Sequence, residues 1–245
     1  MKGSELNPST ELPVRTTRNL IPEGSNARET AYQIIRDKIV RLELRPGEPL
    51  SDKLLAEELN MSRTPVREAV ILLAAFNMVV LRPQIGTFVA PIDTELMEME
   101  QFARFALEKE ILTQACPLLT EEHHWLYTEN LRTYRHYSKT EVSDRATLLL
   151  SLDNEFHRIA FLAAGKEKNF DQMLRTLHHV ERMRMLSVAG LNVDQIYDDH
   201  MAICTNLLAG NLSEALEALD LHLNRYKGNL PSLQAKYPEY FTIGK

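Results

Sequence analysis

Residues 46–70 of the chain read PGEPLSDKLLAEELNMSRTPVREAV, a stretch that predicts two short helices joined by a tight turn. The first helix can begin at Ser51 or Asp52, because both side chains can cap the free backbone N–H groups of a helix N-terminus. Its expected buried side consists of Leu54, Leu55 and Leu59.

The turn and the second helix follow from the next residues of the same stretch. Asn60 and Met61 make the turn, since Asn tolerates the left-handed conformation that a turn requires. Ser62 caps the second helix, and Pro65 falls in its first turn, where a missing N–H is harmless. The residues that pack this helix inward are Val66, Ala69, Val70 and Leu73.

Both flanks of this stretch complete a winged helix-turn-helix. Before it, residues 28–42 carry apolar side chains at the spacing of one helical face. After it, residues 79–81 and 87–89 are short β-prone runs that flank residues 82–86, which predicts a hairpin, or wing. The helix, turn, helix and wing arrive in the order that a DNA-binding domain requires.

The candidate DNA-reading residues surround the second helix of the turn. Arg63 and Arg67 are four residues apart and share one helical face, from which arginine can bind guanine in the major groove. An isolated pair of this kind is more often a solvated surface, but the ordered context favours DNA. The other candidates are Ser62 and Thr64 for phosphates, Lys53 for the backbone or a flanking base, and Gly86 for close approach of the wing to the minor groove.

Beyond the wing, the chain shows almost only helical periodicity. We expect about six helices, near residues 94–115, 120–138, 143–164, 167–188, 193–209 and 212–229. The fold class is therefore mainly α, a winged helix-turn-helix followed by an all-α antiparallel bundle. The expected parts are a mobile arm (1–26), the DNA-binding domain (27–92), a helical effector and dimerisation domain (93–230) and a loosely packed tail (231–245).

The net charge of −6 belongs to the second half of the chain. Residues 28–92 carry nine Lys and Arg against eight Asp and Glu, whereas residues 93–245 carry sixteen against twenty-three. A near-neutral reader domain has to rely on a few well-placed arginines. We see no secretory signal and no apolar run long enough to span a bilayer, and two distant cysteines suit a reduced cytoplasm.

Four residues of the helical half can form a metal site. Asp153 and His157 lie on one face of one helix, while His200 and His222 stand at similar heights on either side of the turn at Gly210. One carboxylate and three imidazoles suit zinc first, and also nickel, cobalt or manganese. Histidine is common in this chain, however, and an Asp-x-x-x-His pair taken alone is more often a surface or core feature than a ligand pair.

The first half resembles the DNA-binding half of GntR-family transcription regulators. That family shows Pro-Gly-x-x-Leu, Leu-Ala-x-x-Leu, Ser-Arg-x-Pro-Val-Arg-Glu-Ala and, in the wing, Gly-x-x-Val. The matching segments here are Pro46-Gly47, Leu55-Ala56, Ser62 to Ala69 and Gly86 to Val89. The resemblance implies a DNA-binding regulator, more often a repressor, that acts as a homodimer on a pseudo-palindromic operator.

From about Asp93 the chain is similar to the FCD effector domain of the FadR-type branch. Asp153, His157, His200 and His222 match the metal-binding positions of that domain one by one. The resemblance therefore implies a divalent metal that anchors a small carboxylate effector. Arg104, in the family's Arg-x-x-Leu-Glu pattern, is a candidate second carboxylate clamp, and an ion pair with a glutamate is the alternative role.

Two rival functions remain open from sequence. A metal-bound water could hydrolyse a substrate, but we find no positioned general base, nucleophile elbow or phosphate loop, so an enzyme is not expected. A regulator that responds to metal alone, without an organic effector, is the other rival.

Overall fold

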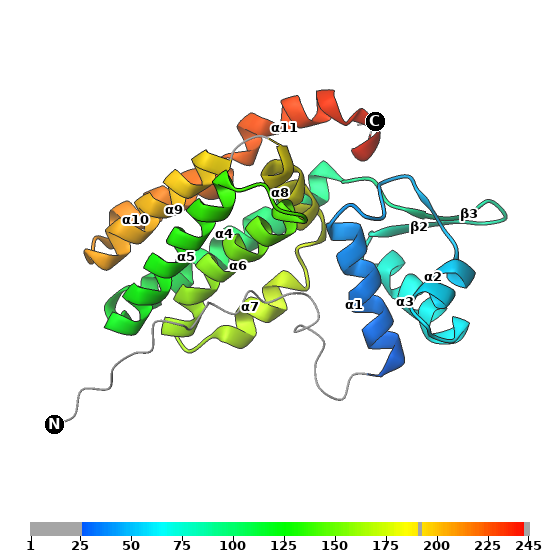
Figure 1. Cartoon of the computed structure of the whole chain (residues 1–245), viewed down its shortest axis with the longest axis horizontal. Coiled ribbons are helices and arrows are strands. Elements are labelled where there is room, and N and C mark those ends of the chain that lie inside the picture. Colours follow the sequence, from blue (N-terminus) through cyan, green and yellow to red (C-terminus); the bar gives the residue numbers. More distant parts are fainter. Residues whose placement is uncertain (1–25, 191–192, 243–245) are drawn as a thin grey trace.

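The computed structural model describes residues 26–190 and 193–242, which form a small winged-helix half and a larger helical half (Figure 1). The expected arm, residues 1–26, lies outside the described residues except for Asn26. Asn26 caps the first helix by accepting the backbone N–H of Glu29.

The winged-helix half contains three helices and a three-stranded antiparallel sheet in the order β1-β3-β2. Val79 of β2 faces Val89 of β3, and Arg82 faces Gly86 across the wing turn. The elements are α1 (Ala27–Val40), β1 (Pro49–Leu50), α2 (Asp52–Glu58), α3 (Arg63–Ala75), β2 (Val79–Arg82) and β3 (Gly86–Val89).

The turn between α2 and α3 follows the prediction. Asn60 has a φ of 52°, in the left-handed region that was expected there. The expected inward residues of α3 are all buried, whereas Leu54 of α2 is 64% exposed and contradicts the prediction. The physical reason is that α2 is a two-turn helix packed on α3, so Leu55 and Ala56 suffice for its contact.

The helical half is antiparallel and has more helices than expected. Its elements are α4 (Thr94–Ala115), the 3-10 turn η2 (Cys116–Leu118), α5 (Glu121–Lys139), α6 (Arg145–Ala163), α7 (Glu167–Leu174), α8 (His178–Gly190), α9 (Val193–Leu208), α10 (Leu212–Asn224), α11 (Tyr226–Lys236) and η3 (Pro238–Tyr240).

The expected helix at residues 167–188 is in fact two helices, α7 and α8. The sequence between α7 and α8 contains no Gly or Pro, and its apolar periodicity continues without interruption. For this reason the sequence predicted one helix. Two contacts from distant elements account for the break. The guanidinium of Arg36 in α1 donates to the carbonyl of Leu174 at 2.7 Å. Glu100 in α4 accepts the N–H groups of His179 and Val180 and thereby caps α8.

The C-terminal segment also departs from expectation, because it is packed rather than loose. The expected helix at 212–229 ends at Asn224, and α11 continues through Pro231. Phe241 is buried and pairs with Ile92, the residue that joins the two halves. The C-terminal segment therefore stabilises the connection between the halves.

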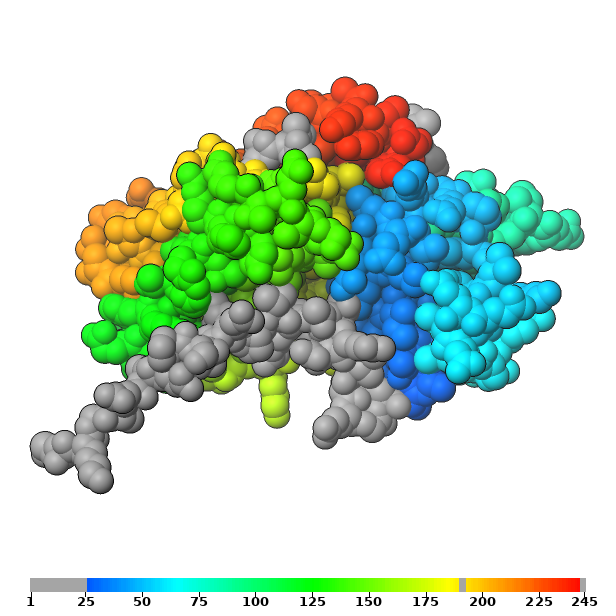
Figure 2. Space-filling view, in the orientation of Figure 1, coloured from blue at the N-terminus to red at the C-terminus, as the bar shows by residue number. Residues whose placement is uncertain are grey.

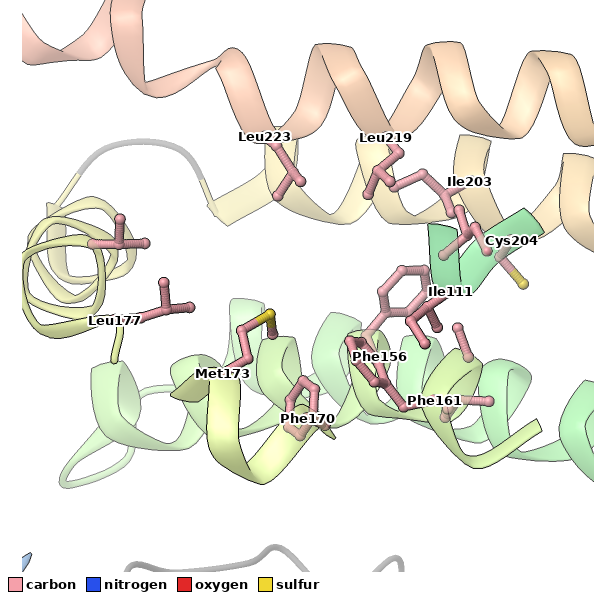
Figure 3. Close-up of a cluster of buried hydrophobic side chains, with 14 of the residues drawn as sticks. Ile111, Phe156, Phe161, Phe170, Met173, Leu177, Ile203, Cys204, Leu219 and Leu223 are labelled. Carbon is pink, nitrogen blue, oxygen red and sulfur yellow. The ribbon is translucent and has the colours of Figure 1, made fainter. Parts of the chain in front are cut away.

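Two apolar cores hold the molecule together. One lies among the helices of the larger half, where Phe156, Phe161, Leu219 and others interdigitate (Figure 3). The other begins in the winged-helix half and continues into α5, α6 and α8 through residues such as Leu149 and Met185. The two halves thus share a continuous apolar contact, with α8 beside α1 (Figure 1).

Candidate functional site

The N-terminal end of α3 presents the candidate DNA-reading side chains to solvent. Arg63, Thr64 and Arg67 are exposed, while Val66 on the opposite face is fully buried. Ser62 occupies the N-cap position, but its side chain makes no capping hydrogen bond. Ser62 therefore lies where the cap was expected, but its hydroxyl does not cap the helix and is available to a phosphate.

The remaining candidate DNA contacts lie beside α3. Lys53 is exposed at the start of α2, with its ammonium 3.9 Å from Glu57. Gly86 is exposed at the wing turn with a φ of 143°, a conformation that other residues rarely adopt. Sequence reasoning missed Arg82, whose guanidinium lies 5.1 Å from the centre of the Phe88 ring in the wing. The wing projects from the end of the molecule (Figure 2).

Asp153, His157, His200 and His222 come together inside the helical half. One potential ligand atom from each of the four residues lies within 4.8 Å of the others, and no other such cluster occurs among the described residues. Helix α6 supplies Asp153 and His157, α9 supplies His200, and α10 supplies His222. One carboxylate oxygen and three imidazole nitrogens form the donor set.

Carboxylates orient two of the three imidazoles. His157 Nδ1 lies 2.6 Å from Glu108 Oε2, and His222 Nδ1 lies 3.4 Å from Asp199 Oδ2. Each carboxylate therefore takes an Nδ1–H and leaves Nε2 with a lone pair. These two Nε2 atoms face each other at 3.2 Å, an arrangement that a cation between them would stabilise.

The third imidazole, His200, is held by packing. Its ring stacks on that of Phe156, with centroids 3.9 Å apart and planes 5° apart. Nε2 of His200 lies 3.3 Å from Asp153 Oδ1, and neither ring nitrogen has a hydrogen-bond partner among the described residues, although the side chain is fully buried. A buried imidazole without partners is costly, and coordination of a metal would satisfy it.

The ionisation states suit a metal site. Burial lowers the pKa of His157 and of His200, and it lowers the pKa of His222 to about 4. Burial alone would raise the pKa of Glu108, but Arg104 and His157 hold it well below its usual range. The imidazoles are thus neutral at pH 7 beside an ionised carboxylate, as a metal ligand and its orienting partner require.

A pocket of about 660 Å³, its open mouth included, adjoins the cluster. Asp153 and His222 lie in its wall together with three arginines, Arg104, Arg184 and Arg225. Met97, Met183 and Leu223 are among its apolar lining residues. A partly open, largely apolar pocket with three guanidinium groups and a metal-ligand set at one end fits a small anion.

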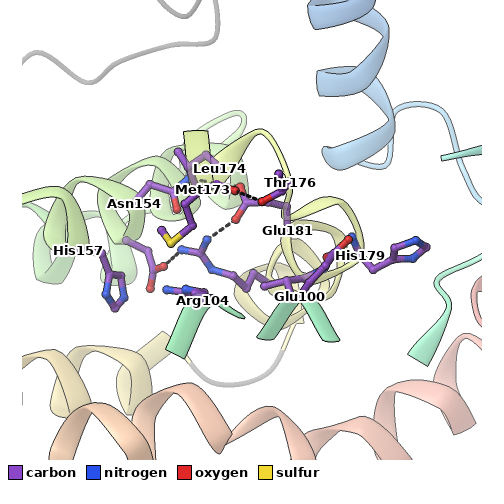
Figure 4. A network of polar contacts seen from close by, with 12 residues as sticks. Glu100, Arg104, Asn154, His157, Met173, Leu174, Thr176, His179 and Glu181 are labelled. Atoms are coloured by element: carbon purple, nitrogen blue, oxygen red, sulfur yellow. Dashed lines mark hydrogen bonds and ion pairs between the residues drawn. The ribbon is translucent and has the colours of Figure 1, made fainter. Parts of the chain in front are cut away.

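The structure shows what each arginine already contacts. Arg104 donates from Nε to Glu108 at 2.6 Å, so the alternative ion pair with a glutamate is present, and Arg104 lines the pocket as well. Figure 4 shows Arg104 beside His157. Arg225 makes two 2.6 Å hydrogen bonds to Asp199. Arg184 contacts both Asp153 and Glu181. Arg184 is therefore the arginine in direct contact with a candidate metal ligand.

Sequence reasoning missed these supporting residues, although weak signals existed. Glu108 ends the Arg-x-x-Leu-Glu pattern that singled out Arg104. Asp199 directly precedes His200, and Arg225 lies three residues after His222. Arg184 had no such signal, since only the packing of α8 against α6 brings it to Asp153.

Comparisons with known proteins agree with both halves. Residues 27–89 match the family described as "Bacterial regulatory proteins, gntR family", and residues 96–225, over half of the chain, match the FCD domain. The chain belongs to the GntR family of transcription regulators. As such it is a DNA-binding regulator with an FCD domain, and not an enzyme.

Relatives of this GntR regulator match most of its length. It is 26% identical to the HTH-type transcriptional repressor RspR of Escherichia coli K12, over 86% of this chain and 92% of that protein. It is 29% identical to an uncharacterised HTH-type regulator of Streptomyces ambofaciens, over 89% and 91% of the two chains. E. coli McbR/YncC shares the fold, with a TM-score of 0.69 at 18% identity, over 87% of this chain and 99% of that one.

Several general properties follow from membership of the GntR family. FCD domains generally bind a metal, and the Asp and His cluster of this regulator could hold one. GntR regulators bind DNA and usually act as dimers. No described helix of this regulator is long and apolar enough to cross a membrane.

Proposed function

We propose that this regulator is a homodimeric cytoplasmic repressor whose affinity for a pseudo-palindromic operator is controlled by a small carboxylate metabolite bound at a metal site. The observation that carries the proposal is the cluster of Asp153, His157, His200 and His222 at the end of an arginine-lined pocket. Zinc is the foremost candidate metal, followed by nickel, cobalt and manganese, because an N₃O donor set suits all four.

The pocket explains how a carboxylate could be recognised. A bound divalent ion would supply a Lewis acid for one carboxylate oxygen. Arg184, which already contacts Asp153, is placed to meet the same anion from α8. Arg104 is a second candidate clamp, since its Nε is used by Glu108 while its planar fork has further donors.

The charge balance also favours an anion. Arg104, Arg184 and Arg225 offset Glu108, Asp153 and Asp199 one for one. A divalent ion would therefore leave the site with an excess of positive charge, reduced by Glu181 where that residue is ionised. An anionic effector of one or two charges would neutralise it.

On the DNA side, we propose direct contacts by Lys53, Ser62, Arg63, Thr64, Arg67 and Gly86. Two copies would place two α3 helices in successive major grooves, because dimer symmetry mirrors operator symmetry. Sequence specificity would come from Arg63 and Arg67, with the hydroxyls and the wing fixing the position on the phosphate backbone.

The test uses the full-length protein and its own operator, recovered by selecting genomic fragments at near-physiological salt. Protein stripped by chelation is reloaded with Zn²⁺, and its metal content and operator Kd are measured with and without candidate carboxylates. We expect one ion per chain and a weaker operator Kd only when metal and carboxylate are both present.

Two variants sharpen this test. His200→Ala should lose the metal and the carboxylate response but keep the DNA binding of metal-free protein, whereas exposed His136→Ala should match the wild type. Full metal content in His200→Ala would contradict the four-ligand site. Release of the operator by metal alone, whatever carboxylate is added, would instead establish the rival metal-responsive regulator.

A further inference from the structure

The cations of the pocket are gathered at one end of it. Its three arginines are Arg104, Arg184 and Arg225, and Arg184 contacts Asp153 of the metal-ligand cluster directly. Each of the other two is joined to a histidine of that cluster through one intervening carboxylate. No further Lys or Arg lines the pocket among the described residues. An anionic group is therefore favoured at the cluster and nowhere else in the pocket.

The rest of the lining is largely apolar, and we call this part the apolar wall. Four helices supply it, with Met97 (α4), Val180, Met183 and Val188 (α8), Ile196 (α9) and Leu223 (α10). Met97 lies about two turns before Arg104 along α4, and Ile196 lies about one turn before His200 along α9. The apolar wall therefore extends roughly one to two helical turns beyond the cluster.

Polar side chains beside the apolar wall already have partners. Buried Gln101 donates from its amide to the carbonyl of Leu223 at 2.5 Å. The buried Ser187 hydroxyl donates to the carbonyl of Met183 at 3.1 Å. The two remaining uncharged polar residues of the lining, both in α11, are only half-buried. A ligand hydroxyl held against this wall would lose its hydrogen bonds to water and find few new ones.

We infer that the effector is a monocarboxylate with an apolar body, an acyl chain or an aryl group, and not a sugar acid or a polycarboxylate. The inference rests on the proposed function and narrows its ligand. The carboxylate lies at the cluster and its arginines, and the body lies against the apolar wall. A second carboxylate on that body would meet no cation. Met97 and Met183 are flexible and polarisable, so the wall can fit straight, branched or aromatic bodies.

A series of straight-chain acids tests the apolar wall. Full-length protein loaded with Zn²⁺ is titrated with acetate, butanoate, hexanoate and octanoate in a calorimeter. Kd should fall by about fourfold for each methylene that enters the wall, as expected for burial of a methylene group. The heat capacity change of binding should become more negative along the series. A Kd that does not depend on chain length would overturn the inference.

Three acids with equal numbers of carbon atoms separate the ligand classes. Adipate replaces the far end of hexanoate with a second carboxylate, and gluconate adds a hydroxyl to every carbon beyond the carboxylate. Both should bind about 100-fold or more weakly than hexanoate, because their extra polar groups would be buried without partners. Binding of either acid as tight as that of hexanoate would contradict the apolar-bodied ligand.

A variant of the wall provides a second test. Met97→Gln keeps the side-chain length and should weaken hexanoate binding by about 10-fold, while the Kd of acetate stays unchanged, because acetate reaches only the cluster. Leu118→Gln is the control, since Leu118 is 52% exposed and does not line the pocket. Metal content should be equal in both variants. An equal loss of acetate and hexanoate affinity in Met97→Gln would show that Met97 supports the fold and not the ligand.

The outcomes distinguish this inference from the proposed function. The chain-length trend without any change in operator Kd would support the apolar-bodied ligand and defeat control of the operator by a carboxylate. Release of the operator by gluconate or adipate, but not by hexanoate, would do the reverse. If none of these acids binds the metal-loaded protein, both proposals fail.

Discussion

Glu108 lies between two hydrogen-bond donors, the guanidinium of Arg104 on one side and the Nδ1–H of His157 on the other. The arginine hydrogen bond keeps the carboxylate ionised, and the carboxylate in turn holds the Nδ1–H of His157 so that Nε2 faces the other candidate ligands. Such an orienting carboxylate generally raises metal affinity by fixing the ring and its tautomer.

Glu108→Gln should therefore weaken metal affinity by about 10–100-fold without removing a ligand. Isothermal titration of metal-free protein with Zn²⁺ measures the change. Glu110→Gln, on the exposed side of the same helix, is the control and should bind as the wild type does. Equal affinity in both variants would mean that His157 needs no carboxylate partner.

The recognition helix offers a second prediction at this scale. Arg67→Ala should cost about 1–3 kcal/mol of specific binding and relax one operator position, because a bidentate contact to guanine would be lost. Fluorescence anisotropy on the operator and on single-base variants measures both effects. Arg132→Ala, at an exposed position on α5, is the control. Unchanged specificity in Arg67→Ala would show that α3 lies differently on DNA.

Single residues were predictable where the signal is local. The i, i+4 spacing of Asp153 and His157 and the symmetric positions of His200 and His222 suffice to bring four donors together once the helices pack. Arg184 was not predictable, because its meeting with Asp153 depends on the angle between α8 and α6. No spacing along the chain encodes that angle.

At the scale of elements, α8 begins where a residue of another helix caps it. Glu100 of α4 accepts the N–H groups of His179 and Val180, at 2.8 and 2.9 Å. Burial nevertheless raises the pKa of Glu100 to about 7, against the opposing effect of those N–H groups and of Arg182. His178 and His179 do not add charge there, since burial lowers the pKa of each to about 3.

This raised pKa predicts a pH dependence of stability. The folded state retains the proton up to about pH 7, whereas the unfolded chain loses it near the ordinary value of 4.5. The unfolded state thus binds fewer protons in this window, and the free energy of unfolding should fall by about 3 kcal/mol as pH rises from 4.5 to 7. Below 4.5 the contribution is fully present.

Urea unfolding of the wild type and of Glu100→Gln across this pH range isolates the effect. The glutamine keeps an acceptor oxygen for the two N–H groups but cannot ionise, so this part of the pH slope should disappear. Glu95→Gln, exposed near the start of the same helix, should keep the wild-type slope. Identical slopes in wild type and Glu100→Gln would mean that Glu100 ionises normally.

The C-terminal segment forms a second element-scale contact. Ile92 donates its N–H to Tyr240 at 2.7 Å and accepts the N–H of Thr242 at 3.0 Å, while Phe241 is buried beside it. Phe241→Ala should lower the free energy of unfolding by about 3–5 kcal/mol, through lost burial and the cavity left behind. Leu221→Ala, at an exposed site, should change it little. Equal free energies of unfolding in the two variants would show that the packing of Phe241 does not stabilise the fold.

Element types were largely predictable, and element ends were not. Periodicity and capping residues gave α1, α2, α3 and the wing, because these segments carry their own start and stop signals. The break between α7 and α8 carries none. It arises from Arg36 and Glu100, contacts made only when the rest of the molecule is in place.

At the scale of the whole molecule, α8 connects the pocket to the DNA-binding half. Val180, Met183 and Arg184 on one side of this helix line the pocket. On another side Arg182, fully buried, donates to the carbonyls of Ala90 and Pro91, which lie between β3 and α4. A ligand that shifts α8 would therefore shift the connection between the halves.

Arg182→Lys should consequently uncouple the sites rather than abolish either, because a single ammonium cannot reproduce the bonds of the guanidinium to both carbonyls. Metal content and the operator Kd measured without effector should stay near the wild-type values. In the wild type we expect metal and carboxylate together to change the operator Kd by about 5–150-fold, as is typical of allosteric coupling. In Arg182→Lys this change should be nearly lost. Arg158→Lys, paired with Glu155 on α6 away from the connection, should respond fully. A full response in Arg182→Lys would mean that the signal passes through another helix that lines the pocket, such as α4, which begins directly after the connecting residues.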